Sequence, residues 1–119
     1  MADSHELGRQ SERVAAHYLE ARGYDIVERN FRVGHKEVDL IVRRDDLIAF
    51  VEVKARAGAG YGHPLEAITW VKRREVGHVA RVWIAAHGRR GFAYRFDAIA
   101  VIWRDGRPDI EHVPNAWAL

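Results

Sequence analysis

The sequence contains no cysteine, and this absence excludes disulfide bonds, thiolate zinc sites and cysteine nucleophiles at once. A chain without cysteine fits a reducing compartment, so we expect a cytoplasmic protein. Long apolar runs are also missing, since none approaches the roughly 20 residues that a membrane span requires. Residues 1–22 alternate charged and apolar positions, which is unlike a signal peptide. We therefore expect no association with membranes.

The composition predicts one globular domain with a preference for arginine. Its 119 residues are enough for one hydrophobic core and too few for two, so the predicted domain spans residues 1–119. With 48% hydrophobic and 30% charged residues, the chain is neither disordered nor membrane-like. The formal net charge is only +2, but arginine far outnumbers lysine. Because a guanidinium group can bind phosphate through two parallel hydrogen bonds, nucleic acid is a candidate partner.

The pattern of apolar residues predicts an α/β fold. Helical spacing marks residues 4–22 and 69–87. Strand-like runs occupy 24–32, 37–43, 47–55, 93–103 and 109–113. This order predicts a mixed sheet of about five strands with helices on its faces. The glycine-rich segment 58–64, which includes Gly58, Gly60 and Gly62, is predicted to be a mobile loop near the substrate.

The most strand-like part of the chain, KEVDLIVRRDDLIAFVEVKAR (36–56), carries charges inside its apolar runs. A hairpin with a two-residue loop at 45–46 would place Asp39 opposite Glu52 and Glu37 opposite Lys54. Since side chains alternate along a strand, all four would share one face of the sheet. The opposite face would then carry Val38, Leu40, Val42, Ala49, Val51 and Val53.

Two interpretations of this charged cluster remain open. In the first, Lys54 pairs with one carboxylate in a buried ion-pair network. That network leaves two further carboxylates beside it, and neighbouring like charges raise each other's pKa or recruit a cation. In the second, the carboxylate oxygens form a site for Mg²⁺ or Mn²⁺, which prefer such hard ligands. A lysine two residues beyond a metal-binding glutamate could then orient an attacking water.

The pattern Asp39, twelve residues, Glu52-Val53-Lys54 resembles the D…ExK signature of the PD-(D/E)xK nuclease superfamily, which includes restriction endonucleases and archaeal Holliday-junction resolvases. More widely, the chain resembles the YraN-like family of small bacterial proteins described as predicted endonucleases. The matching blocks are GRQSERVAAHYLEARGY (8–24), RNFR (29–32), KEVDLIV (36–42), FVEVKAR (50–56), PLEAI (64–68) with Lys72, RFDAIAV (95–101) and IEHVPNAW (110–117).

The resemblance implies a restriction endonuclease-like (tRNA endonuclease-like) core and a metal-dependent endonuclease that cleaves structured or branched DNA. It implies that Asp39 and Glu52 bind Mg²⁺ or Mn²⁺, that Val53 contributes its backbone carbonyl and that Lys54 is the catalytic lysine. It also assigns metal-site roles to two further acids, Glu12 and Glu37. A homodimer is a further implication, because junction-cutting relatives act as pairs. Ser11 departs from the glycine that the family often has before the helix glutamate.

Several other residues are candidates for contacts with nucleic acid. Lys72, Arg73 and Arg74 open the second helix, either as a phosphate-binding patch or as a charged turn facing solvent. Arg56 and His63 flank the glycine-rich loop and could extend this surface. The tryptophans predicted to belong to the core are Trp70, Trp83 and Trp103, while Trp117 would cap the core or contact a partner subunit.

Two other classes of function compete with the endonuclease. The chain could be a nucleic-acid-binding module that keeps the nuclease fold without turnover, in which case DNA binding would depend on salt but not on metal. It could also be a structural or interaction protein in which the charged cluster is an ion-pair network. Binding of divalent metal separates the first hypothesis from the other two.

Overall fold

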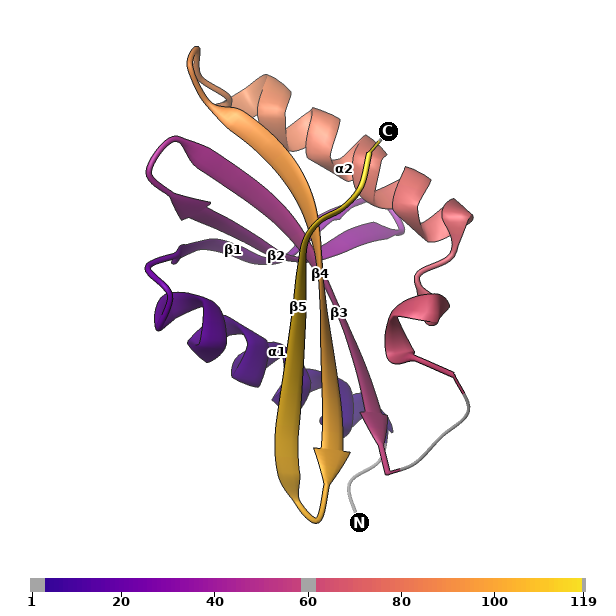
Figure 1. The fold of residues 1–119 in the computed structure, drawn as a ribbon. Coiled ribbons are helices and arrows are strands. Elements are labelled where there is room, and N and C mark those ends of the chain that lie inside the picture. Colours follow the sequence, from indigo (N-terminus) through magenta and orange to yellow (C-terminus); the bar gives the residue numbers. More distant parts are fainter. Residues whose placement is uncertain (1–3, 59–61, 119) are drawn as a thin grey trace.

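Five strands form one mixed sheet that is sandwiched between two helices (Figure 1). The computed structural model describes residues 4–58 and 62–118, so Gly60 of the predicted loop lies outside the described residues. The elements are α1 (Ser4–Glu20), β1 (Asp25–Val33), β2 (Lys36–Arg44), β3 (Leu47–Ala57), the 3-10 turn η1 (Pro64–Ala67), α2 (Trp70–His87), β4 (Ala93–Arg104) and β5 (Arg107–Trp117).

The strands lie in sequence order from β1 to β5, and only the central pair β3–β4 is parallel. The other neighbours are antiparallel and joined by short turns, whereas η1 and α2 connect β3 to β4. The predicted α/β class, the mixed five-stranded sheet and the helices on both faces are confirmed. The edge strand β5 is longer than predicted and contains Pro114, which an edge strand tolerates because its outer side needs no N–H donor. Neither described helix combines the length and hydrophobicity needed to cross a bilayer.

The helix α1 covers one face of the sheet with small and aliphatic side chains. Ala15, Ala16 and Leu19 recur at helical spacing and are fully buried against Leu40 and its neighbours on β2, β3 and β4. Next to this core, Trp103 donates a hydrogen bond from Nε1 to Ser11 Oγ over 2.8 Å, and the Ser11 side chain is buried. Ser11 therefore anchors α1 to β4 at the position where the resembled family often has glycine.

The helix α2 covers the other face with an aromatic core. Phe50 lies at its centre, with the rings of Trp83 and Phe96 each 5.8 Å away. Trp117 stacks on Phe96 and is 8% exposed, so it caps this core as predicted. The prediction for Trp70 is wrong, because its side chain is 67% exposed. Trp70 is the first residue of α2 and projects from the helix instead of packing beneath it.

The hairpin of β2 and β3 has the predicted loop at 45–46, and its register runs from Arg44↔Leu47 to Leu40↔Val51. Beyond Leu40 the strand follows β1 instead of β3, and Glu37 pairs with Arg32. The predicted pairing of Glu37 with Lys54 is therefore wrong. The predicted face of Val38 is also wrong, since Val38 packs in the core beneath α2. Both errors have the same cause, because alternation holds only while the ladder with β3 continues.

A buried carboxylate, Asp97, joins β4 to β5. Its oxygens accept hydrogen bonds from Arg95, from His112 Nε2 at 2.8 Å and from the backbone N–H of Asn115 at 3.0 Å. Burial alone would raise the pKa of Asp97, but the hydrogen bonds from His112, Arg95 and Asn115 outweigh it and lower that pKa. Tyr24 completes the network by accepting a hydrogen bond from Arg95.

We expect Asp97→Ala to lower the free energy of unfolding at pH 7 by about 3 kcal/mol, because it leaves buried donors without an acceptor. Since the folded pKa is lowered, this stabilisation is complete above the unfolded value of 3.8 and is lost as pH falls through the folded value. Urea unfolding at pH 7 and pH 3 should show the difference between wild type and variant narrowing in acid. Asp46→Ala, in an exposed turn, is the control and should change stability by less than about 0.5 kcal/mol.

Candidate functional site

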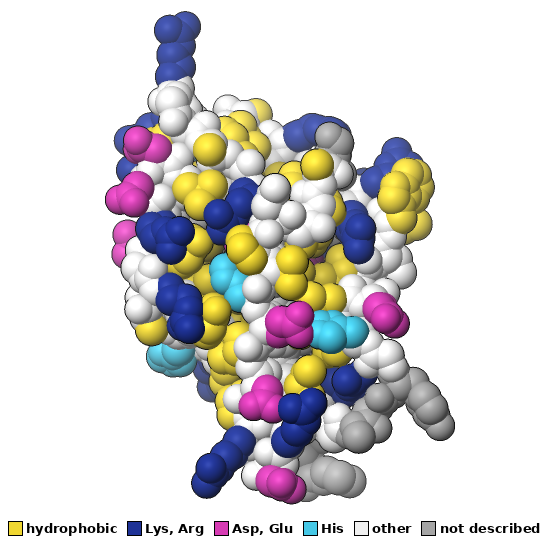
Figure 2. Space-filling view, in the orientation of Figure 1, with side chains coloured by type: hydrophobic (Ala, Val, Ile, Leu, Met, Phe, Trp, Pro, Cys, Tyr) yellow, Lys and Arg dark blue, Asp and Glu magenta, His cyan; other side chains and the backbone are white. Residues whose placement is uncertain are grey.

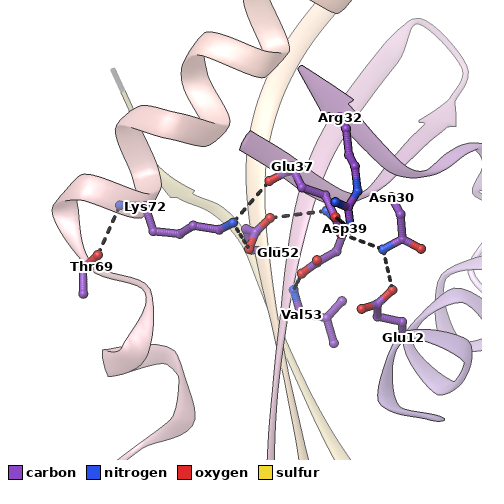
Figure 3. Close-up of polar contacts among 9 residues, drawn as sticks. All are labelled: Glu12, Asn30, Arg32, Glu37, Asp39, Glu52, Val53, Thr69 and Lys72. Atoms are coloured by element: carbon purple, nitrogen blue, oxygen red, sulfur yellow. Dashed lines mark hydrogen bonds and ion pairs between the residues drawn. The ribbon is translucent and has the colours of Figure 1, made fainter. Parts of the chain in front are cut away.

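The candidate site lies where β2 and β3 stop pairing. Beyond this point, two carboxylates accept the backbone hydrogen bonds that the partner strand would otherwise accept. The backbone N–H of Asp39 donates to Glu52 Oε1 over 3.3 Å. The backbone N–H of Val53 donates to Asp39 Oδ2 over 2.7 Å (Figure 3). Each carboxylate thus satisfies a backbone donor of the opposite strand, which would otherwise be buried and unpaired. One oxygen of each acid, Asp39 Oδ1 and Glu52 Oε2, is left for other partners.

Both carboxylates are held in surroundings that disfavour their negative charge. Glu52 is 1% exposed, and burial together with the nearby Asp39 carboxylate raises the pKa of Glu52 to about 9. Burial likewise raises the pKa of Asp39 to about 6, against the hydrogen bond from Val53, which lowers it. The pair therefore binds a proton near neutral pH, and a cation bound beside it would stabilise the fully ionised form.

Two lysines lie on the carboxylate face of β3. The Lys72 ammonium reaches in from α2, with its Nζ 3.9 Å from Glu52 Oε2 and 3.3 Å from the carbonyl oxygen of Glu37. Thr69 caps α2 and accepts a hydrogen bond from the Lys72 N–H, which fixes the start of the helix (Figure 3). Lys54 follows Glu52 by two residues in a regular ladder with β4, so both side chains emerge on one face. In the described part of the chain, Lys54 makes no hydrogen bond or ion pair.

The α1 side of the site is organised by Asn30, which the sequence analysis did not single out. Its Nδ2 donates to Glu12 Oε1 and to Glu37 Oε1, each over 2.8 Å. The other oxygen of Glu37 pairs with Arg32 Nη2 at 2.8 Å, so Glu37 is directed toward β1. Asn30 has a positive φ of 51°, a conformation that asparagine tolerates better than most residues. An asparagine inside a strand-like run was the only signal that could have indicated this bridge.

The oxygens of Asp39 and Glu52 suit Mg²⁺, which keeps several water ligands, better than a metal ion whose ligands all come from the protein. Among residues 4–58 and 62–118, no three His, Asp or Glu side chains converge in a group that could hold a metal ion. Mg²⁺ commonly binds through one or two carboxylates and keeps several waters, and Asp39 with Glu52 provides such a pair. The predicted ligand Val53 is adjacent to both, while Glu12 and Glu37 are engaged by Asn30.

The five residues predicted to contact nucleic acid have different partners within the fold. Only Lys72 reaches the carboxylates. Arg73 donates to the Ile68 carbonyl, and the guanidinium of Arg74 stacks over the exposed ring of Trp70, 4.7 Å from its centroid. The remaining two lie beside the partly described loop, where Arg56 donates to the Gly62 carbonyl and His63 pairs with Glu111 at 2.6 Å. On the face shown in Figure 2, basic side chains are scattered among other residues.

The fold and site thus define a small α/β protein in which Asp39 and the buried Glu52 form a carboxylate pair where β2 and β3 stop pairing. The chain belongs to the uncharacterised protein family UPF0102, whose family model matches residues 11–101. It is similar to a UPF0102 protein of Clavibacter michiganensis (44% identity over 117 residues, 98% of this chain and 99% of the relative). A UPF0102 protein of Rhodococcus jostii is also 44% identical, over 118 residues (98% and 100%). One from Myxococcus xanthus is 37% identical over 116 residues (98% and 92%). The predicted membership of the YraN-like family is confirmed.

We expect Glu52→Gln to stabilise the metal-free protein at high pH. Because the pKa of Glu52 is about 9 in the folded state and 4.5 in the unfolded chain, folding takes up a proton between these values. Wild-type stability should therefore fall as pH rises through this range, and the neutral glutamine should remove much of that dependence. In EDTA at pH 8.5, the variant should melt about 3 °C or more above wild type, with the gap closing toward pH 4.5.

The matched control for this comparison is Glu66→Gln, an exposed residue outside the site. Its melting temperature should follow that of wild type at every pH. A difference between Glu52→Gln and wild type that stays constant from pH 4.5 to pH 8.5 would contradict the proposed protonation of the pair.

Proposed function

We propose that this protein is a metal-dependent endonuclease that hydrolyses phosphodiester bonds in structured or branched DNA. The observation that carries the proposal is the pair of the partly buried Asp39 and the buried Glu52, which cap each other's strands and are followed on β3 by Lys54. The D…ExK pattern, the mixed sheet and the helices on both faces support the assignment to the PD-(D/E)xK superfamily with a restriction endonuclease-like core.

In this proposal, Asp39, Glu52 and the backbone carbonyl of Val53 would hold Mg²⁺ or Mn²⁺. A bound divalent ion would polarise the phosphoryl group and lower the pKa of a water molecule. Lys54 would orient the attacking water and stabilise negative charge on the phosphate, since its ammonium lies near enough to Glu52 to lower that pKa and makes no hydrogen bond or ion pair among the described residues.

The remaining polar residues position this centre. Lys72 offsets part of the negative charge of Glu52 from the α2 side. Asn30 holds Glu12 close enough to Asp39 for the charge of Glu12 to contribute to the raised pKa of Asp39. Glu12 and Glu37 therefore support the carboxylate pair and are available to hold metal-bound water through hydrogen bonds.

A second candidate function is binding of nucleic acid without cleavage. It is favoured by the hydrogen bonds from Asn30 to Glu12 and Glu37, which engage both of these acids within the fold. The two candidates differ in one respect that can be measured. A binding module should retain DNA when Asp39 is replaced and should release no product with any divalent metal.

We expect the purified protein with Mg²⁺ or Mn²⁺ to cleave at least one DNA from a panel of duplex, flap and four-way junction. Asp39→Asn should reduce cleavage to background, because it removes a ligand charge. Lys54→Met should lower the rate by about 10²–10⁴-fold, the usual contribution of a group that assists proton transfer. Product formation on denaturing gels, together with Mn²⁺ binding by calorimetry, measures both effects.

Asp45→Asn is the control, because it makes the same chemical change in the exposed turn of the same hairpin. It should cleave like wild type. Equal cleavage by wild type, Asp39→Asn and Lys54→Met would indicate a contaminating nuclease. Metal binding and DNA binding without product in any arm would favour the second candidate.

A further inference from the structure

Three arginines surround a hollow on the α1 side of the carboxylate pair. The hollow measures about 290 Å³ and is lined by Arg9, Glu12, Arg13, Arg29, Asn30 and Leu40. Arg9 and Arg13 lie one turn apart on α1, and Arg29 pairs with Leu40 across β1 and β2. Neither α1 nor β1 was expected from the sequence to contact a ligand through these arginines.

The arginines of this hollow differ from most others because the fold does not use their charge. In the described part of the chain, no carboxylate or aromatic ring pairs with Arg9, Arg13 or Arg29, and all three are exposed. Several guanidinium groups elsewhere are engaged: Arg32 pairs with Glu37 and Arg95 with Asp97, while Arg74 stacks on Trp70. Arg9 and Arg13 are like charges one helical turn apart on α1, a spacing that slightly destabilises an isolated helix and that a bound anion would relieve.

The one acid that lines the hollow, Glu12, offsets at most one of the three positive charges and forms no ion pair with these arginines in the described part of the chain. Glu12 directs Oε1 to Asn30, which bridges it to Glu37 at the candidate site. Leu40, on the floor of the hollow, directly follows Asp39. The hollow is linked to the candidate site through Glu12 and Asn30, which line it, and Glu12 approaches the pair from the side opposite Lys72 (Figure 3).

We propose that Arg9, Arg13 and Arg29 form a binding site for the backbone phosphates of a polynucleotide, one or more nucleotides away from the bond at Asp39 and Glu52. This inference rests on the proposed function for its ligand. Guanidinium groups bind phosphate oxygens through parallel hydrogen bonds, and three of them at one hollow match a repeating phosphodiester better than an isolated anion. The nucleic acid then crosses α1 and β1, not the surface of Arg73 and Arg74 predicted from the sequence.

The test is the salt dependence of DNA binding by the full chain in EDTA, where cleavage is prevented. Fluorescence anisotropy with a labelled duplex and a labelled four-way junction compares wild type with the triple variant Arg9→Gln, Arg13→Gln, Arg29→Gln. Each lost phosphate contact reduces the slope of log K against log salt by about 0.9, so the variant should lose about 2 to 3 units of slope and about tenfold or more in affinity.

A triple variant with the same change in net charge serves as the control: Arg89→Gln, Arg90→Gln, Arg107→Gln. These three arginines are exposed and do not line the hollow. The control should bind like wild type. Equal losses in both triple variants, no loss in the hollow variant, or no DNA binding by wild type would each overturn the inference. Melting curves should show that both variants fold.

The outcome separates this inference from the proposed function. Selective loss of binding in the hollow variant, with no cleavage by wild type under any metal, supports the phosphate site and contradicts the endonuclease. Cleavage by wild type with normal binding by the hollow variant supports the endonuclease and contradicts the phosphate site.

Discussion

The reciprocal capping of Asp39 and Glu52 is the interaction on which the rest of the site depends. It allows β2 to leave β3 in the middle of the sheet without leaving buried N–H groups unpaired, which would cost about 1–3 kcal/mol each. The first half of β2 then turns with β1 toward α2, and Val38 enters the core beneath that helix. The side chains that form the candidate site are therefore the same ones that permit the sheet to open there.

Because the sheet opens at this point, the carboxylate pair is reached from both faces, and the two helices supply different surroundings. On one side, α2 brings the Lys72 ammonium to Glu52. On the other, α1 brings Glu12, held by Asn30. A cation bound by Asp39 and Glu52 would offset the negative charge of these acids. A phosphate beside that cation would in turn offset the positive charge of the cation and of Lys72. If Arg9, Arg13 and Arg29 bind phosphate as proposed, a substrate phosphate would approach the pair from the α1 side.

The sequence predicted the order of the elements and the register of the central hairpin near its turn, because a two-residue loop and the alternation of side chains determine both. It did not predict where that register would end. The end depends on hydrogen bonds between side chains and backbone, made by Asp39 and Glu52, which no periodic pattern reveals. The prediction for Trp70 failed for a related reason. A tryptophan at the first residue of a helix contributes the same apolar residue to the sequence pattern whether it faces the core or solvent. The role of Asn30 depends on a left-handed backbone conformation that becomes visible only in three dimensions.

The contrast between two buried carboxylates in the same sheet bears on whether the site is functional. Asp97 is surrounded by donors, its pKa is lowered, and its charge is fully used in joining β4 to β5. Glu52 is equally inaccessible, yet its pKa is raised, because Lys72 and one backbone N–H do not compensate for burial and for Asp39. Asp39 and Glu52 have a structural role, since apolar side chains in their place would leave the backbone N–H groups of Asp39 and Val53 unpaired, but that role uses only one oxygen of each acid. The raised pKa of Glu52 indicates that its hydrogen bond does not compensate for burying its charge, and the binding of a cation is the simplest gain that would offset this cost.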